Sequence, residues 1–302
     1  MKPAVKRILI TGSNGLLGQK LVKYCLENHI DFLATANSSN RYSLCPDLHF
    51  SILDITKPDQ VKGIVSRYQP THIINAAAMT NVDACEAQVE NCNAVNVNGV
   101  KHLLSEAKAL NIHLIQISTD FIFDGKKKLY HERDLANPLS VYGASKWKAE
   151  ALIAESKYPN VTILRTSILY GTGESLNKSN IFNWAMEALR ADKELTIVND
   201  QFRTPTFVAD LVQACFKVIE QNVKGVFNVA GGELNSMYEF ILLLADYVGA
   251  PRSLVQAISS DQLNQNAKRP QSSGLIIDKA IHTFAYQPTS FVESLLEIDP
   301  NN

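Results

Sequence analysis

The chain has 302 residues, which is enough for one large α/β domain and a smaller appended one. Hydrophobic residues make up 46% of it, charged residues 20%, and the formal net charge is -1. This balance gives no basic excess for a nucleic-acid partner, and no stretch approaches the roughly 18 apolar residues of a membrane span. The five cysteines are scattered and form no CxxC pair, so the sequence predicts a reduced cytoplasmic protein.

Short runs of Ile, Val and Leu alternate with longer helical patterns through the first half of the chain. Strands are predicted over 7–11, 32–36, 72–75, 112–117 and 161–166, and helices over 16–28, 59–68, 85–110 (broken near residue 90) and 142–156. Strand–helix alternation of this length indicates βαβ units. We therefore expect an α/β fold of the Rossmann type, with a doubly wound parallel sheet between two layers of helices.

The pattern changes after Gly171. Residues 171–180 are rich in Gly, Ser and Asn and predict a loop. Helices are predicted over 181–191, 206–221 and 236–249, strands over 195–198 and 227–230, and an extended segment over 267–273. We expect residues 1–170 to form the sheet domain and residues 171–302 mainly a smaller domain, with segments near 206–231 returning to the first.

A glycine turn follows the first predicted strand, at Gly12, Gly15 and Gly18. The first glycine permits the tight turn, the second lets the backbone approach a pyrophosphate, and the third lets the following helix pack closely. The helix N-terminus offers free N–H groups and a positive dipole end to phosphates. The GxxGxxG spacing is a variant of the dinucleotide-binding fingerprint, and it predicts a dinucleotide cofactor. The alternative is a turn that needs glycine for its own geometry.

The second predicted strand ends at Ala36 and is followed by Asn37, Ser38, Ser39, Asn40 and Arg41. No acidic side chain is present there to accept a hydrogen bond from an adenosine 2′-hydroxyl, whereas Arg41 would attract a 2′-phosphate. This pattern favours NADPH as the cofactor, with NADH also possible. The alternative is that Arg41 is simply a solvated loop residue with no role in cofactor binding. Asp54 could accept from the adenine amino group, although an Asp at a strand end often caps a helix.

Tyr142 and Lys146 form a YxxxK pair, which shares one face of a helix. A free tyrosine has a pKa of about 10, and a lysine cation one turn away favours its phenolate. Such a pair suits proton transfer near neutral pH, although a surface pair gives the same spacing. Ser118, Thr119 and Asp120 end an apolar strand, where a hydroxyl could polarise a substrate carbonyl or make ordinary turn bonds.

Together these motifs resemble the extended short-chain dehydrogenase/reductase family, and within it the branch of dTDP-4-dehydrorhamnose reductases, which reduce a 4-keto nucleotide sugar with NAD(P)H. The most specific stretches are STDFIFDG at 118–125 and DQFRTPT at 200–206. The others are 12–18, 75–78, 82–86, 96–99, 138–146, 165–167, 209–211 and 269–270.

The resemblance implies that Thr119, Tyr142 and Lys146 are the catalytic group. The candidate cofactor-binding residues are Gly12, Asn14, Gly15, Leu16, Leu17, Gly18, Asn37, Arg41, Asp54, Ile55, Ala76, Ala77, Ala78, Asn96, Ser118, Tyr142, Lys146, Ser167 and Ile168. The candidate substrate-binding residues are Thr80, Val82, Asp120, Phe121, Gln201, Arg203 and Arg269. The expected partner is a nucleotide-sugar substrate, and a homodimer is left open.

Three departures from related patterns matter. Ile168 stands where family members often carry Trp near the sugar, which leaves the sugar open. Gln19 and Lys20 follow the third glycine where some members carry a metal-binding acid, so no such metal is expected. Phe121 stands where the sugar 4,6-dehydratases place Glu, which argues against dehydration.

Two other functions remain open. One is a nucleotide-sugar epimerase of the same fold, which would retain its nicotinamide and need no added reductant. The other is a regulatory role, because Ile168-Leu169-Tyr170-Gly171 is similar to the corresponding sequence of the methionine adenosyltransferase regulatory subunit. Such a protein would bind NADP and a partner enzyme.

Overall fold

Seven parallel strands form the central sheet of the protein, which a computed structural model describes over residues 6–176, 180–263 and 265–299. In order across the sheet they are β12 (Gly225–Asn228), β7 (Val161–Thr166), β5 (His113–Thr119), β4 (His72–Asn75), β1 (Arg7–Thr11), β2 (Asp31–Ala36) and β3 (Phe50–Ile52). The chain starts near the centre of the sheet, adds β2 and β3 on one side, and then builds outward from β4 on the other. The direction therefore reverses between β1 and β4, and open α/β sheets bind ligands beyond the carboxyl ends of their strands at such a point.

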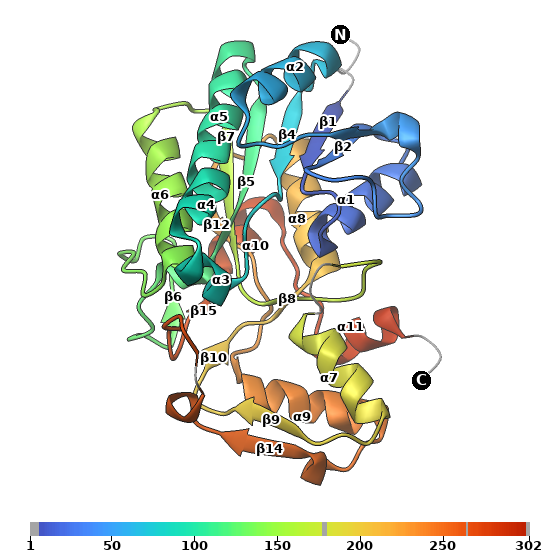
Figure 1. Cartoon of the computed structure of the whole chain (residues 1–302), viewed down its shortest axis with the longest axis vertical. Coiled ribbons are helices and arrows are strands. Elements are labelled where there is room, and N and C mark those ends of the chain that lie inside the picture. The colour runs from blue at the N-terminus through green and yellow to red at the C-terminus, as the bar shows by residue number, and fades with distance from the viewer. Residues whose placement is uncertain (1–5, 177–179, 264, 300–302) are drawn as a thin grey trace.

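Helices cover both faces of this sheet (Figure 1). One face carries α1 (Leu16–Glu27) and α8 (Val208–Glu220), and the other carries α2 (Pro58–Tyr68), α5 (Gly99–Leu110) and α6 (Val141–Glu155). Because successive strand residues point to opposite faces, Ile8 packs in the core on the α1 side and Leu9 in the core on the α2 side. Both strand faces are therefore buried, as a parallel sheet requires.

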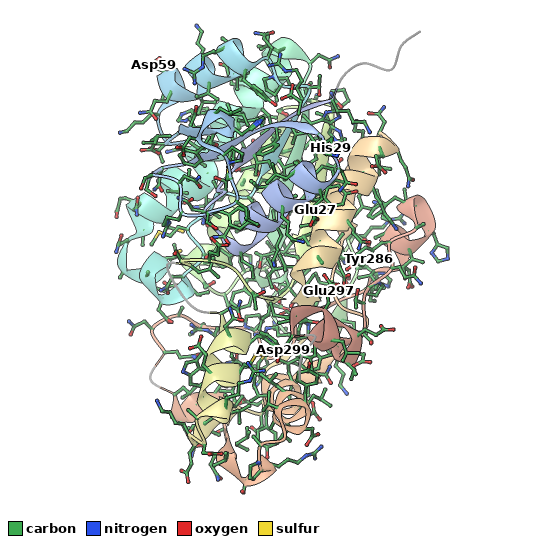
Figure 2. The ribbon with its side chains drawn as sticks, turned by 90° about the vertical axis from the view of Figure 1, so that its right-hand side faces the viewer. Glu27, His29, Asp59, Tyr286, Glu297 and Asp299 are labelled. Carbon is green, nitrogen blue, oxygen red and sulfur yellow. The ribbon has the colours of Figure 1, made fainter. Side chains whose placement is uncertain are left out.

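Helices α1 and α8 lie side by side, and Figure 2 views this side of the molecule, with Glu27 labelled at the end of α1. The rings of Tyr24 and Phe216 stack between them with their centroids 4.1 Å apart. A helix from the later part of the chain thus completes one face of the sheet.

The helical run between β4 and β5 is divided into four segments. They are α3 (Val82–Ala87), α4 (Val89–Asn93), a π-helical turn (Ala94–Asn98) and α5. The expected break lies at Gln88, which ends α3 and begins α4. These short segments lie beside the start of α6, which carries Tyr142 and Lys146.

The remaining elements lie mainly beyond the carboxyl ends of the strands, in the lower part of Figure 1. The helices there are α7 (Ile181–Arg190), α9 (Met237–Val248) and α11 (Phe291–Ile298). The paired strands are β9 (Leu195–Val198) with β14 (Val255–Ile258), β10 (Phe202–Arg203) with β13 (Asn235–Ser236), and β11 (Thr206–Phe207) with β8 (Leu169–Tyr170). The ring of Tyr170 contacts Phe182, Phe207, Phe240 and Phe291, which joins these elements to the end of the sheet.

Later segments return to the sheet. Strand β12 extends it beyond β7, α10 (Asp278–Phe284) packs against β12, and β15 (Gly274–Leu275) pairs with β6 (Leu129–Tyr130). The chain therefore passes several times between the sheet and the lower elements, and a domain limit at residue 170 stays a prediction. Among the described residues, no helix combines the length and the apolar composition needed to span a membrane.

Candidate active site

A cleft of about 580 Å³ opens where β1, β2, β4, β5 and β7 end. It therefore lies at the point where the strand order reverses. Most of the residues proposed from the sequence line it: Gly12, Asn14, Gly15, Leu16, Leu17, Gly18, Asn37, Arg41, Asp54, Ile55, Ala76, Ala77, Ala78, Thr80, Val82, Ser118, Thr119, Asp120, Phe121, Tyr142, Lys146, Ser167 and Ile168.

The glycine turn lines this cleft, and close packing explains two of its three glycines. Gly12 has a φ of +70°, and a Cβ there would lie 2.7 Å from the backbone nitrogen of Ala77. A Cβ on Gly18 would lie 2.3 Å from the carbonyl oxygen of Gly12, so α1 packs directly on the turn. A Cβ on Gly15 would lie 3.4 Å from the Gly12 carbonyl oxygen, which is an ordinary contact, so packing leaves room at this position of the cleft lining.

Asn14 connects the glycine turn to the loop after β2. Its Nδ2 donates to the Oγ of Ser38 at 3.2 Å and to the carbonyl of Ser39 at 2.8 Å, and its Oδ1 accepts from the backbone N–H of Arg41 at 2.9 Å. Asn14 is 5% exposed, so these bonds are shielded from water. The loop that carries Arg41 is thereby held at the cleft wall.

Asp54 also lines the cleft, just after β3 and beside the end of β2, and it closes a turn before α2. Its Oδ1 accepts from both the backbone N–H and the Oγ1 of Thr56, at 2.9 and 2.7 Å. The N-cap of α2 is Lys57, whose side chain makes no cap bond within the described part of the chain. Asp54 thus orders a turn at the cleft rather than capping the helix itself.

Strand β5 and helix α6 bring the three proposed catalytic side chains to the same cleft. Thr119 is the last residue of β5, and Tyr142 and Lys146 lie one turn apart at the start of α6. Helix α6 begins there because the Ser140 side chain accepts from the backbone N–H of Gly143 and caps it. The ring of Tyr142 lies edge-on to Phe121, with the centroids 6.0 Å apart.

Burial raises the pKa of Tyr142 above its ordinary value, and the hydrogen bond with Thr119 offsets part of this rise. The phenol is therefore protonated at neutral pH and can act as a proton donor. The direction of this shift is opposite to the one expected from the Lys146 cation, because burial is its largest cause. A protonated tyrosine suits the direction in which a carbonyl oxygen gains a proton.

Lys146 is buried and points its Nζ at the carbonyl of Ile117, 2.7 Å away. Burial lowers its pKa to about 8, while Glu150 raises it. A pKa near 8 leaves the ammonium largely charged at neutral pH. The protein therefore places a cation on the same face of α6 as the phenol.

Asp120 is 2% exposed, and its carboxylate contacts the Thr119 side chain. Its Oδ1 accepts from the Thr119 hydroxyl at 3.1 Å, and its Oδ2 accepts from Ser167 at 3.2 Å and from Ser273. Arg203 lies 3.7 Å from the same Oδ2. Burial raises the pKa of Asp120, and Arg203 and these hydroxyls oppose that rise.

Four of the proposed residues do not line the cleft: Asn96, Gln201, Arg203 and Arg269. Arg203 is 1% exposed and donates to the backbone carbonyls of Phe202 and Pro270, each at 2.7 Å. Arg269 forms an ion pair with Asp83 at 2.6 Å. These contacts hold the segment near residue 270 in place, and a direct role of either arginine in binding substrate stays a prediction.

Asn96 lies in the π-helical turn and holds the segment that follows β4. Its Oδ1 accepts from the backbone N–H of Met79 at 2.8 Å, and its Nδ2 donates to the Met79 carbonyl at 3.0 Å and to the Ser145 hydroxyl at 2.9 Å. It therefore links the cleft wall to α6 without facing the cleft. Gln201 is also buried.

The cleft has further lining residues that the sequence did not single out. They are Ala36, Leu53, Asn75, Val95, Ile117, Thr166, Leu169, Leu176, Asn180 and Leu211. Several directly precede or follow proposed residues at strand ends, so the strand-end rule could have found them. Leu176 and Asn180 come from the predicted loop 171–180, of which residues 177–179 lie outside the described part, and no sequence signal marked them.

The cleft fits a dinucleotide. Packing leaves room at Gly15, the first turn of α1 presents N–H groups that lack intrahelical partners, and the second strand is followed by Asn37 and Arg41 rather than by an acid. The volume is within the range of cofactor sites, about 300–1,000 Å³. The donor set thus suits phosphate groups.

The sheet order and the position of the cleft define a Rossmann-type protein. The chain belongs to the RmlD substrate binding domain family, whose family pattern matches residues 6–299. This family assignment agrees with the resemblance inferred from the motifs.

Individual relatives cover almost the whole chain. A dTDP-4-dehydrorhamnose reductase of Aggregatibacter actinomycetemcomitans is 35% identical over 97% of this chain and 98% of its own. A solved structure of a dTDP-4-dehydrorhamnose reductase ortholog from Clostridium acetobutylicum has a TM-score of 0.86 and 30% identity, covering 97% of this chain and 98% of its own. That of Bacillus anthracis, in complex with NADP, has a TM-score of 0.86 and 28% identity, covering 98% and 99%.

A second kind of relative is similar at nearly the same level. The methionine adenosyltransferase 2 subunit beta of Danio rerio is 31% identical over 89% of this chain and 82% of its own. The overall likeness therefore includes proteins with two different names, and the side chains in the cleft have to distinguish between their functions.

Proposed function

We propose that this protein reduces a 4-keto nucleotide sugar with NADPH, converting dTDP-4-dehydrorhamnose to dTDP-rhamnose. The observation that carries the proposal is the meeting of Thr119, Tyr142 and Lys146 in one cleft above the glycine turn. The reductases of Aggregatibacter, Clostridium and Bacillus, which this chain resembles over almost its full length, support the same activity.

The chain's own residues account for the proton half of the reaction. Tyr142 donates its phenolic proton to the 4-keto oxygen. The Thr119 hydroxyl, which donates to Asp120 Oδ1 in this structure, turns to donate its hydrogen bond to the same substrate oxygen as negative charge develops there. The Lys146 ammonium stabilises the phenolate that remains on Tyr142. When bound, NADPH supplies the hydride that reaches the sugar carbon.

The residues that would hold NADPH follow from the cleft. Gly12, Gly15 and the start of α1 would hold the pyrophosphate, and Asn37 and Arg41 would face the 2′-phosphate. The complex of the Bacillus anthracis reductase with NADP supports this choice. NADH remains usable in the proposal, because no side chain in the loop after β2 rejects a free 2′-hydroxyl.

We also propose the rest of the site from the resemblance. Thr80, Val82, Asp120 and Phe121 would contact the sugar nucleotide from the cleft wall, and Ser167 and Ile168 would approach the carboxamide of the cofactor. A cytoplasmic location is supported by the five buried thiols, all of them free. Self-association as a homodimer belongs to the same proposal.

The test is a panel of 4-keto nucleotide sugars, assayed by loss of NADPH absorbance with the purified full chain. Turnover is expected with dTDP-4-dehydrorhamnose, with weaker or no turnover for sugars of another configuration. If NADPH is oxidised with none of the sugars in the panel, the proposed reaction is refuted.

A regulatory function is the second candidate, because the chain is also similar to the methionine adenosyltransferase 2 subunit beta of Danio rerio. It predicts NADP binding, co-purification with a synthetase and no turnover on any keto sugar. The same panel therefore separates the two functions.

A further inference from the structure

Glu150 lies four residues after Lys146 on the buried face of α6 and is 3% exposed. Its carboxylate accepts from the Oγ of Ser118 at 2.5 Å and from Arg165, whose Nη2 lies 2.6 Å and whose Nε lies 3.1 Å away. Arg165 is 4% exposed. A buried charge persists only when it is paired in this way, so Glu150 and Arg165 form one ionic unit inside the protein.

This ionic unit connects α6 to two strand ends. Ser118 directly precedes Thr119 in β5, and Arg165 directly precedes Thr166 in β7, where Ser118 and Arg165 are register partners. Arg165 also donates from Nη1 to the carbonyl of Glu132 at 3.0 Å. The rotation and the axial position of α6 are therefore set against the strand that carries Thr119. Those same two variables decide where Tyr142 and Lys146 lie.

The Glu150 carboxylate also acts on Lys146 through space. Lys146 is buried and donates to one backbone carbonyl, that of Ile117. Burial lowers its pKa to about 8, and two groups raise it, Glu150 from the same helix and the Cys92 thiol from α4. Since a thiol is mostly neutral at pH 7, Glu150 is the formal negative charge that favours the ammonium.

We propose that Glu150 is a positioning residue for the proton transfer. Its bonds to Ser118 and Arg165 hold α6 in register with β5, and its negative charge keeps Lys146 in the ammonium form. The inference rests on the proposed reduction, in which the O–H bond of Tyr142 breaks, the proton goes to the substrate oxygen and a hydride from NADPH reaches the carbon. A charged Lys146 stabilises the phenolate left behind, whereas a neutral amine does not.

The direct test is the pH profile of kcat for the wild type and for Glu150→Gln. Removing the negative charge lowers the alkaline limit of activity by about one pH unit, because a Coulomb term of that size typically accompanies loss of a neighbouring charge. KM for the sugar changes less than kcat does. Glu150→Asp, which retains the charge, restores most of the alkaline limit.

Glu155→Gln is the matched control, because Glu155 is at the exposed end of the same helix. It removes an equal charge and leaves the profile where it was. An alkaline limit that is the same in the wild type and Glu150→Gln, or that shifts equally in Glu155→Gln, would overturn the inference.

Glu150→Gln leaves Arg165 without a carboxylate partner, and loss of one partner of a buried ion pair is strongly destabilising. If that variant does not fold, the double variant Glu150→Gln with Arg165→Met is compared with Arg165→Met alone, so that the two proteins differ only in the carboxylate. The alkaline limit is lower in the double variant, and equal limits in the two folded proteins contradict the proposal.

A second readout needs neither sugar nor cofactor. The ¹⁵N chemical shift of the Lys146 side chain, assigned by its loss in Lys146→Met, reports the lysine titration directly. That titration moves to lower pH in Glu150→Gln if the inference holds, and it does not move if Glu150 has only a structural role. Absence of sugar reduction by the wild type would refute the proposed function, and the lysine titration would still decide the role of Glu150.

Discussion

The hydroxyl of Tyr142 is the one atom that the proposed reaction needs from this side chain. Tyr142→Phe keeps the ring against Phe121 and removes the acid, so kcat falls by about 10²–10⁴-fold, the range for loss of a positioned acid or base. The affinity for NADPH, measured by fluorescence titration, stays nearly constant because the glycine turn is untouched.

Tyr158→Phe is the control for that substitution. Its hydroxyl donates to the carbonyls of Ala107 and Ile112, at 2.9 and 2.8 Å, outside the cleft. This variant loses some stability and keeps its kcat. Equal turnover by Tyr142→Phe and the wild type would remove Tyr142 from the mechanism.

Arg41 is expected to decide between the two nicotinamide cofactors. Asn14 holds its backbone at the cleft wall, and a guanidinium–phosphate contact is worth about 1.5–3 kcal/mol. Arg41→Ala should therefore raise KM for NADPH about tenfold or more and leave KM for NADH unchanged. Arg67→Ala, on α2 and outside the cleft, serves as the control. If the ratio of the two KM values is the same in Arg41→Ala and the wild type, the 2′-phosphate is recognised elsewhere.

The site was predictable where its signal is local in the sequence. The spacing of Tyr142 and Lys146 alone predicts that they share one face of a helix. The position of Thr119 at the end of an apolar run predicts that it lies at the end of a strand. Arg203 gives no such sign, because its partners are carbonyls near residue 270. Contacts between residues so far apart depend on how β10 packs, and this cannot be derived from spacing.

At the scale of elements, the contact between α1 and the glycine turn makes a direct test. Gly18→Ala places a methyl group 2.3 Å from the Gly12 carbonyl oxygen and 2.5 Å from the Ser13 Cα. These are backbone atoms, which cannot move away without shifting the chain, so the free energy of unfolding should fall by about 2–3 kcal/mol. Urea unfolding measures this loss, and weaker NADPH binding should accompany it.

Gly63→Ala is the opposite case within the same protein. Gly63 lies in the interior of α2, and apart from the neighbouring helix backbone no described atom lies within 4 Å of the position that a methyl group would take there. Alanine there should stabilise the protein by about 0.5–1 kcal/mol through helix propensity. If Gly18→Ala did not lower the free energy of unfolding relative to Gly63→Ala, close packing at Gly18 would not be the reason for its glycine.

The bounds of helices and strands that are long enough to show a hydrophobic pattern were predicted to within a few residues. Strands 7–11, 72–75, 161–166 and 195–198 have the expected bounds. The helix predicted over 236–249 is α9, Met237–Val248, with Ser236 and Gly249 as its two caps. The strand expected over 227–230 is instead Gly225–Asn228. Two-residue strands such as β8 and β11 were missed because they exist only as a pair, and a pattern needs several residues to show its period.

For the whole molecule, two buried histidines predict a loss of stability in mild acid. His72 and His113 lie at the amino ends of β4 and β5, with ring centroids 5.5 Å apart. Burial, with Lys224 nearby, lowers the pKa of His72 to about 4 and that of His113 to about 3. Thr162 donates to the Val223 carbonyl, so it accepts from Nε2 of His113, and Nδ1 of that ring has no partner among the described residues.

The unfolded chain protonates these rings near pH 6.5 and the folded protein only near pH 3–4. Their stability contribution is therefore complete above pH 6.5 and is lost as the pH falls towards 4. Each histidine adds up to about 1.4 kcal/mol per pH unit to the slope of stability against pH. His113→Gln should reduce that slope, measured by urea unfolding between pH 7 and about 4.5. An equal slope in the variant would show that His113 is not responsible.

Strand β12 completes the sheet beside β7, although the whole stretch from β8 to α8 separates the two in the chain. On the ribosome, β7 is made first, and the backbone N–H and C=O groups along its outer edge have no strand partner until Gly225–Asn228 emerges. At about 5–20 residues per second this interval lasts several seconds, and such an edge is a template for joining other chains. Translation that stops within this interval should therefore yield an aggregating fragment rather than a working half of the enzyme.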